Sequence, residues 1–163
     1  MKKTSPPRTR STGIQIRDLQ LIDIPKVVDL GEKVFNEDTL PLLHRTWDET
    51  EVLNNYSTDA EFCLIATNGK TIVGFALASL MEKAGANERQ SIYGWLHWIG
   101  VSPRHRGKGI AQTLIDELTN RLKAVGAQFL LADSDESNND ALNFFTQSGF
   151  NAKTRHVFFA KDI

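Results

Sequence analysis

The chain has 163 residues, of which 40% are hydrophobic and 24% charged, and this fits one globular domain with a substantial core. Its formal net charge of −1 gives no global field that would favour nucleic acid or an anionic membrane. No apolar run approaches the roughly 20 residues of a membrane span, and a lone cysteine, Cys63, excludes an intrachain disulfide. We therefore expect a cytoplasmic protein without membrane or nucleic-acid partners, in which Cys63 is a buried thiol and not a nucleophile.

The first segment is basic and rich in proline. Residues 1–13 carry four Lys and Arg residues and two prolines, and they lack the apolar stretch of a secretory signal. We expect residues 1–13 to form a disordered basic arm and residues 14–163 to form a single domain.

The next segments predict a strand, a helix and an irregular stretch. Apolar and polar residues alternate over 14–19, and Asp23 with Pro25 marks the start of a helix that continues to Phe35. The stretch 36–56 contains a short predicted helix over 48–55. Its apolar, aromatic and histidine residues either line a substrate pocket or close the core, and the second is favoured for most of them. They are residues 40–43, His44 and Trp47.

The middle of the chain predicts a hairpin followed by a loop. Residues 61–66 and 71–81 have the composition of strands, and the Asn68-Gly69 pair between them is typical of a tight hairpin turn. Residues 82–90 are polar and contain a glycine, which indicates a loop.

The C-terminal half predicts alternating strands and helices. Residues 91–101 form a central strand, and apolar residues recur at helical spacing from Ile110 until Gly126 ends that helix. The apolar run 129–132 predicts a strand buried on both faces, a helix capped by Ser137 or Asn138 follows, and residues 150–160 predict closing strands. A mixed α/β sheet with helices on both faces would bury these segments.

The segment 101–110, VSPRHRGKGI, follows the central strand and opens the helix at Ile110. Its glycines let a ligand approach the backbone, the free N–H groups of a helix start point at anions, and three local cations strengthen the field. The pattern is neither a P-loop nor a dinucleotide fingerprint. Taken alone, it fits a pyrophosphate site and a solvated basic loop equally well.

Two motifs give the chain a family resemblance. Arg-x-x-Gly-x-Gly at 104–109 follows a strand that ends in Gly-Val-x-Pro, and Asn-x-x-Ala-x-x-Phe-Phe at 138–145 precedes Gly149-Phe150. Together, in this order, they resemble the acyl-CoA-binding and downstream segments of the GNAT superfamily of N-acetyltransferases. The resemblance is sharp over residues 92–150 and weaker over residues 14–91.

The resemblance implies a mostly antiparallel sheet whose fourth and fifth strands splay apart to admit acyl-CoA. It also implies that backbone groups of Ile99 and Val101 pair with the pantetheine arm, and that an N–H near Ile99 serves as oxyanion donor. The residues that the resemblance places at acetyl-CoA are Ile99, Gly100, Val101, Arg104, His105, Arg106, Gly107, Lys108, Gly109, Ile110, Ala111, Asn138, Ala141, Phe144 and Phe145.

Some of these residues have an alternative role, and one departs from the family pattern. Asn138 is also a good helix cap, and Phe144 is also a good core residue. Many family members have tyrosine where this chain has Phe145, and that hydroxyl is placed to protonate the leaving thiolate. Phenylalanine has no proton to give, so another group must protonate the thiolate, or it leaves unassisted, or turnover is poor.

The expected general base is His97, in the central strand, because imidazole accepts a proton near neutral pH. A period of two would place its side chain on the same face as Ile99 and Val101, unless a bulge alters the parity. Tyr93 is a second candidate on the same face, and a core histidine is the alternative role for His97. Acidic residues after the fifth strand could attract a cationic amine or form a solvated loop. They are Asp133, Asp135 and Glu136.

The sequence thus predicts an enzyme that transfers an acetyl group from acetyl-CoA to a primary amine by direct attack. The acceptor stays open among small amines, amino acids and peptide or protein amines, and the protein is expected to be a monomer or a homodimer. A CoA-binding regulatory module with little turnover is the alternative. No metal site is expected, because His44, His105 and His156 have no ligand spacing.

Overall fold

The computed structural model describes residues 13–36, 45–83, 91–155, 157, 159 and 161. Residues 1–12 of the predicted arm, residues 40–44, most of the loop at 82–90, and His156 lie outside the described residues. The chain forms two compact units, one up to Asp133 and one from Ser134. The prediction of a single domain stays a prediction.

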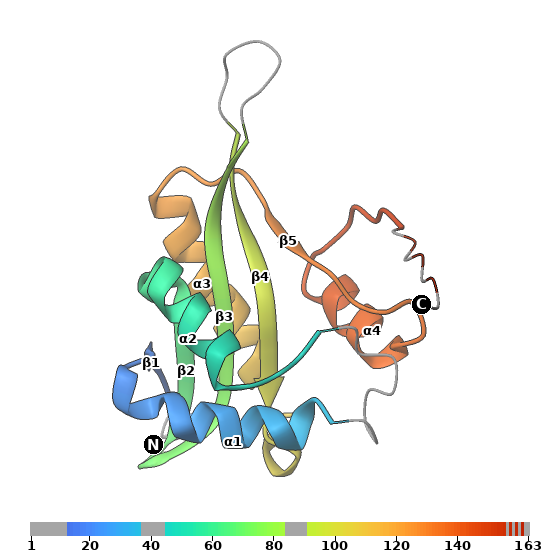
Figure 1. The fold of residues 1–163 in the computed structure, drawn as a ribbon. Coiled ribbons are helices and arrows are strands. Elements are labelled where there is room, and N and C mark those ends of the chain that lie inside the picture. Colours follow the sequence, from blue (N-terminus) through green and yellow to red (C-terminus); the bar gives the residue numbers. More distant parts are fainter. Residues whose placement is uncertain are drawn as a thin grey trace, which may run out of the picture. The chain divides into compact units, whose positions relative to one another are not determined.

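The first unit contains all the strands and all but one of the helices that the structure describes (Figure 1). In chain order its elements are β1 (Ile14–Asp18), η1 (Leu21–Asp23), α1 (Ile24–Val34), α2 (Glu49–Asp59), η2 (Ala60–Phe62), β2 (Cys63–Asn68), β3 (Thr71–Lys83), β4 (Ser91–Val101), η3 (Pro103–His105), α3 (Ile110–Ala124) and β5 (Leu130–Ala132). The second unit holds α4 (Asn139–Gln147).

The strands form one sheet in the order β1-β2-β3-β4-β5. The pairs from β1 to β4 are antiparallel, whereas β5 runs parallel to β4. The hairpin between β2 and β3 turns at Gly69, whose φ of 58° lies in the left-handed region that glycine tolerates best. The predicted hairpin turn is therefore confirmed, as is the mixed sheet.

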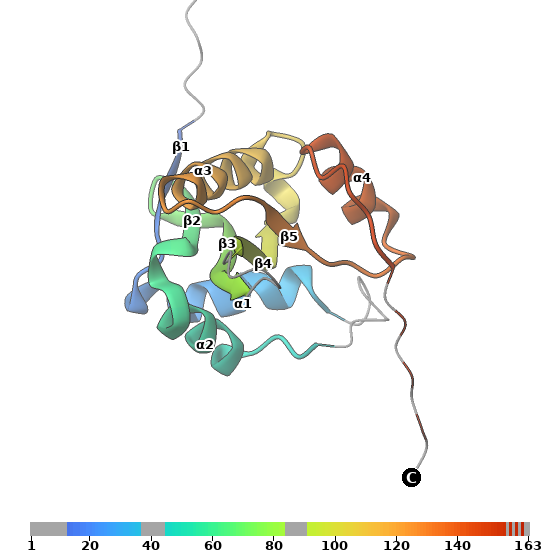
Figure 2. The same cartoon turned by 90° about the horizontal axis from the view of Figure 1, so that it is seen from above.

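Helices cover both faces of the sheet, as predicted. Figure 2 shows α1 and α2 on one side and α3 on the other. On the α1–α2 side, Val27 and Val52 of the helices pack with Phe75 and Trp98 of β3 and β4. On the other side, α3 buries an apolar stripe at the spacing predicted from the sequence, formed by Ile110, Leu114, Ile115, Leu118 and Leu122. The two faces therefore bury separate sets of side chains.

Trp47 closes the core beside α1, which is the favoured role for it. Its indole N–H donates to the carbonyl of Val28 (3.0 Å), and its ring stacks on Phe75 with centroids 5.1 Å apart. The ring occupies the space beside Gly31, where a Cβ atom would lie 2.0 Å from Trp47 Cε2. Glycine at this position is thus a packing requirement within α1.

Asp23 has a different role from the predicted start of α1. Its carboxylate accepts two hydrogen bonds from Arg17 (2.6 and 2.9 Å) and one from the backbone N–H of Gln20 (3.0 Å). These bonds close the short turn η1, and α1 begins immediately after it with Pro25 in its first turn. The helix-start signal was correct, but the side chain caps the preceding turn.

Near the C-terminus one predicted strand is present but is not buried as expected, and the predicted closing strands are not found among the described residues. The strand β5 lies within the predicted run, but Phe129 and Leu131 are 46% and 40% exposed, so this run is not buried on both faces. The described residues of 150–160 form no strand, and there Val157 and Phe159 are exposed. Alternation of apolar residues indicates a strand only where a neighbouring strand can pair with it.

Candidate active site

The central feature of the site is an open edge of β4. Pairing between β4 and β5 covers only Gly94 to Leu96 of β4, although β4 continues to Val101. Beyond Leu96, β4 has β3 on one side and no paired strand on the other among the described residues. The strand β5 thus ends opposite Leu96 and leaves the last part of β4 open, which is consistent with the splay that the family resemblance implies (Figure 1).

A β-bulge decides which backbone groups face this edge. The register between β3 and β4 shifts at Leu77/Ala78, which leaves His97 without a paired residue on β3. Before the bulge, the N–H of Gly94 faces β5; after it, the N–H of Ser102 donates to Val73 of β3 (2.9 Å). Because backbone groups of alternate residues share one edge, Ile99 and Val101 face the open side.

The same bulge changes the side-chain faces. His97 Nε2 lies 2.7 Å from the hydroxyl oxygen of Ser79, and Trp98 belongs to the core cluster on the α1–α2 side. Val101 lies on the other face, where a Cβ atom at Gly74 would be 3.4 Å from it. The expectation from a period of two that His97 shares a face with Ile99 and Val101 is therefore wrong.

Gly100 has a packing role between these two edge residues. A Cβ atom there would lie 2.8 Å from the ring of Phe75, so the strand needs glycine to accept that ring. Gly100 therefore has a packing role in the core, and its backbone groups face β3.

The loop after β4 presents its backbone openly. Gly107 and Gly109 have φ of 72° and 75°, and a Cβ atom at either would meet nothing within 4 Å. The first helical bond of α3 joins the N–H of Thr113 to Gly109 (2.9 Å), so the N–H groups of Ile110 and Ala111 have no acceptor within the helix. The loop thus leaves donors and space together at a helix start, which is an arrangement suited to an anion.

The side chains of this loop add positive charge. Arg104, Arg106 and Lys108 are exposed and make no ion pair with the described residues. His105 differs from them, because its Nδ1 atom is buried and has no hydrogen-bond partner among the described residues. Because they are exposed and unpaired with the described residues, Arg104, Arg106 and Lys108 are available to an anionic ligand.

His97 is held in an environment that favours its neutral form. Burial, followed by the positive charge of Arg45, lowers the pKa of His97 below its usual value, and the carboxylates of Glu51, Asp133 and Asp59 oppose this only partly. Arg45 donates to the carbonyl oxygen of His97 (3.1 Å) and lies 4.5 Å above the ring of Trp98. A neutral imidazole can accept a proton, as a general base must.

The other predicted candidates have different surroundings. Tyr93 stacks on Phe129 with ring centroids 5.0 Å apart. Asp133 forms an exposed, loose pair with Arg45 (3.6 Å), and Glu136 pairs with Arg155 (3.1 Å). Such exposed pairs contribute little to stability, so these acids stay available to solvent.

The second unit contains the downstream motif. Asn138 accepts a hydrogen bond from the N–H of Ala141 (3.1 Å), so it caps α4, as one of its two expected roles requires. The ring of Phe145 lies between those of Phe144 and Phe150, with centroids 5.3 and 5.1 Å away. Phe145 is thus a packing residue within this unit.

A polar pocket lies beside His97, and the sequence did not predict it. It has a volume of about 320 Å³ and is lined from α2 by Glu51 and Asn54 and from β3 by Ser79. Ser79 is 3% exposed and is the only polar side chain in the run 72–81 of β3, which is the signal that could have drawn attention to it. Glu51 and Asn54 carry no such signal, because polar residues are ordinary on an exposed helix.

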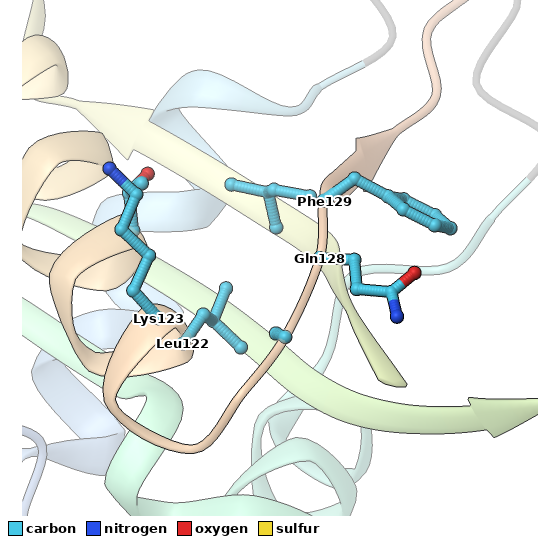
Figure 3. A pocket seen from close by; sticks show the side chains of 7 residues that line it. Leu122, Lys123, Gln128 and Phe129 are labelled. Carbon is cyan, nitrogen blue, oxygen red and sulfur yellow. The ribbon is translucent and has the colours of Figure 1, made fainter. Parts of the chain in front are cut away.

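A second cavity lies on the other face of the sheet. It has a volume of about 70 Å³ and lies between the end of α3 and the residues leading into β5, with Leu122 and Phe129 in its lining (Figure 3). Apart from Lys123, its lining has no titratable side chain. It therefore offers little chemistry of its own.

Other kinds of site find no support in the described part of the chain. No group of three or more His, Cys, Asp and Glu residues there could hold a metal ion. No helix among the described residues has the length and apolarity needed to cross a membrane. Cys63 is fully buried, as predicted, and burial raises the pKa of its thiol to about 12.

The fold is similar to those of several solved acetyltransferases. AAC(6')-Iy in complex with the bisubstrate analogue CoA-S-monomethyl-acetylneamine has a TM-score of 0.71 and 20% identity, over 92% of this chain and 99% of that one. The aminoglycoside 6'-N-acetyltransferase AAC(6')-Ih from Acinetobacter baumannii has a TM-score of 0.69 and 19% identity, over 92% and 99%. A transcriptional regulator from Bacillus halodurans C-125 has a TM-score of 0.73 and 20% identity, over 91% and 99%.

These identities are low, so the solved structures establish the fold. The sequence profile of the acetyltransferase (GNAT) family matches residues 30–150, which include the open edge of β4, the loop after it and α4. The chain therefore belongs to the acetyltransferase (GNAT) family.

Proposed function

We propose that the protein moves the acetyl group of acetyl-CoA to a primary amine by direct attack. One observation carries this proposal: the open edge of β4 at Ile99 and Val101 continues directly into a loop with free donors and open glycines. An extended ligand with an anionic end fits such a line of groups. Membership of the family supports acetyl-CoA as that ligand.

In this proposal the two parts of the line bind different parts of acetyl-CoA. Backbone groups of Ile99 and Val101 bind the amides of the pantetheine arm as an added strand would. N–H groups of residues 106–111 bind the pyrophosphate, and the cations Arg104, Arg106 and Lys108 balance its charge. Gly107 and Gly109 keep the approach free of side chains.

His97 is the proposed base. The amine arrives as an ammonium ion and gives a proton to the neutral imidazole, directly or through water, and its lone pair then attacks the thioester carbon. A C–N bond forms, the C–S bond breaks, and the second amine proton leaves as the amide forms. The products are the acetylated amine and CoA, with one proton released to solvent. A backbone N–H near Ile99 is the proposed donor to the oxyanion.

The remaining predicted residues keep narrower roles. Tyr93 is a second candidate for proton transfer. Asn138, Ala141, Phe144 and Phe145 stay predictions for the cofactor site. Because Phe145 has no hydroxyl, the departing thiolate must take its proton from another group or from solvent.

The alternative is a CoA-binding module with little turnover, and Phe145 is the observation that favours it. A titration by calorimetry with acetyl-CoA and, separately, CoA tests the shared claim, and we expect saturable binding in the micromolar range. Thiol release from acetyl-CoA across a panel of amines then separates the two functions. Binding without release for any amine would favour the module, and no binding by a folded protein would overturn both.

A further inference from the structure

The polar pocket beside His97 offers a specific chemistry. Its lining combines carboxylate, amide and hydroxyl groups from Glu51, Asn54 and Thr58 of α2 with Ser79 of β3, and Met81 is its only apolar side chain. Its volume of about 320 Å³ lies at the lower end for small-molecule sites. These groups can form hydrogen bonds to the polar groups of a small molecule.

His97 connects this pocket to the open edge of β4. Its Nε2 atom lies 2.7 Å from the hydroxyl of Ser79 inside the pocket, while its backbone belongs to the edge that runs on to Ile99. A molecule in the pocket would meet the proposed base, which lies two residues before Ile99 on the same strand. The pocket is thus correctly located for an acetyl acceptor.

Glu51 supplies a fixed negative charge in this pocket. Its Oε1 atom accepts hydrogen bonds from the indole of Trp98 (2.6 Å) and the side-chain amide of Asn55 (3.1 Å). No described residue donates to its Oε2 atom. The nearby Asp59 is already engaged, because its carboxylate accepts the N–H of Leu80 (2.8 Å). Glu51 is therefore the carboxylate best placed to bind a cation.

We propose that this pocket binds the acceptor and selects small hydrophilic primary amines, with Glu51 holding the ammonium group before His97 takes its proton. Asn54 and Thr58 bind neighbouring hydroxyl or amide groups of the acceptor. Alkylamines of the same size lack the hydroxyl or amide groups that would make these hydrogen bonds. This inference rests on the proposed acetyl transfer.

Two matched pairs of amines test the selection: 3-aminopropan-1-ol against butylamine, and 4-aminocyclohexanol against 4-methylcyclohexylamine. Thiol release should give a kcat/KM at least about tenfold higher for the hydroxylated member of a pair, since a hydrogen-bonding site rejects analogues that lack the group. Glu51→Gln should raise KM for the hydroxylated amine about tenfold, because it removes a charge-assisted bond. It should leave the Kd for acetyl-CoA unchanged.

Glu49→Gln is the matched control, because Glu49 is exposed on the same helix and does not line the pocket. Glutamine at 51 keeps an oxygen that can accept from Trp98, and melting temperatures check that both variants fold. An unchanged KM in Glu51→Gln, a preference for the alkylamines, or no acetylation of any probe by protein that binds acetyl-CoA would overturn this inference. Failure to bind acetyl-CoA would instead overturn the proposed function.

Discussion

Gly107→Glu should abolish acetyl-CoA binding without unfolding the protein. A side chain at Gly107 meets nothing within 4 Å, so the cost to folding is that of a φ of 72°, about 1–2 kcal/mol for a residue other than glycine. The carboxylate would project at the proposed pyrophosphate site. If two charge-assisted hydrogen bonds to the pyrophosphate are lost at about 1.5 kcal/mol each, binding loses about 3 kcal/mol, and the Kd for acetyl-CoA rises more than about 100-fold.

Gly126→Glu is the matched control for this change. Gly126 has a φ of 85°, is exposed and has equally open space around it, but it follows the far end of α3. Urea unfolding should show similar losses of stability in the two variants, and calorimetric titration should show loss of acetyl-CoA binding in Gly107→Glu alone. Normal affinity in Gly107→Glu, or equal loss in both, would refute the placement of the anion site.

Three further predictions concern proton transfer and stability. His97→Gln should lower kcat about 100-fold. Because burial lowers the pKa of His97, the rate of the wild type should fall only at a pH below the usual imidazole pKa of about 6.5, and the variant should lack this fall. An unchanged pH–rate profile would exclude His97 as the base. Asp23→Asn should lower the free energy of urea unfolding near pH 7 by only about 1–2 kcal/mol, because Arg17 is partly exposed. The difference between variant and wild type should disappear as the pH falls below about 3.8 and through the lowered pKa of Asp23. A difference that persists at low pH would contradict the ion pair. Gly31→Ala should lower the free energy of unfolding by about 1–2 kcal/mol. The cost of overpacking the new methyl group against Trp47 exceeds the gain in helix propensity of about 1 kcal/mol. A stabilised variant would contradict that contact.

Local patterns predicted the elements around the site well. The bounds of β4 were those expected, because turn-forming residues flank a long apolar run. The start of α3 and its buried stripe were also expected, since helical periodicity is strong from Ile110 onward. The loop between them was found through its glycines and cations, which carry their chemistry in the sequence itself.

The parts that depend on distant contacts were harder to predict. The bulge at His97 arises from pairing with β3, and no residue type in β4 marks its position. The pocket needs α2 to pack over Ser79, and Glu51 gains its role only through its bond to Trp98. The apolar run of β5 suggested burial on both faces, but such burial requires elements that cover both faces of the sheet at this strand, and these come from distant parts of the chain.

Hydrogen exchange of the wild-type protein with and without acetyl-CoA tests the central claim most directly. The account predicts slower exchange of the backbone amides at 106–111 and of those at Ile99 and Val101 when acetyl-CoA is bound, because these amides become donors to the ligand. Binding that slows exchange elsewhere and leaves these amides unchanged would contradict it.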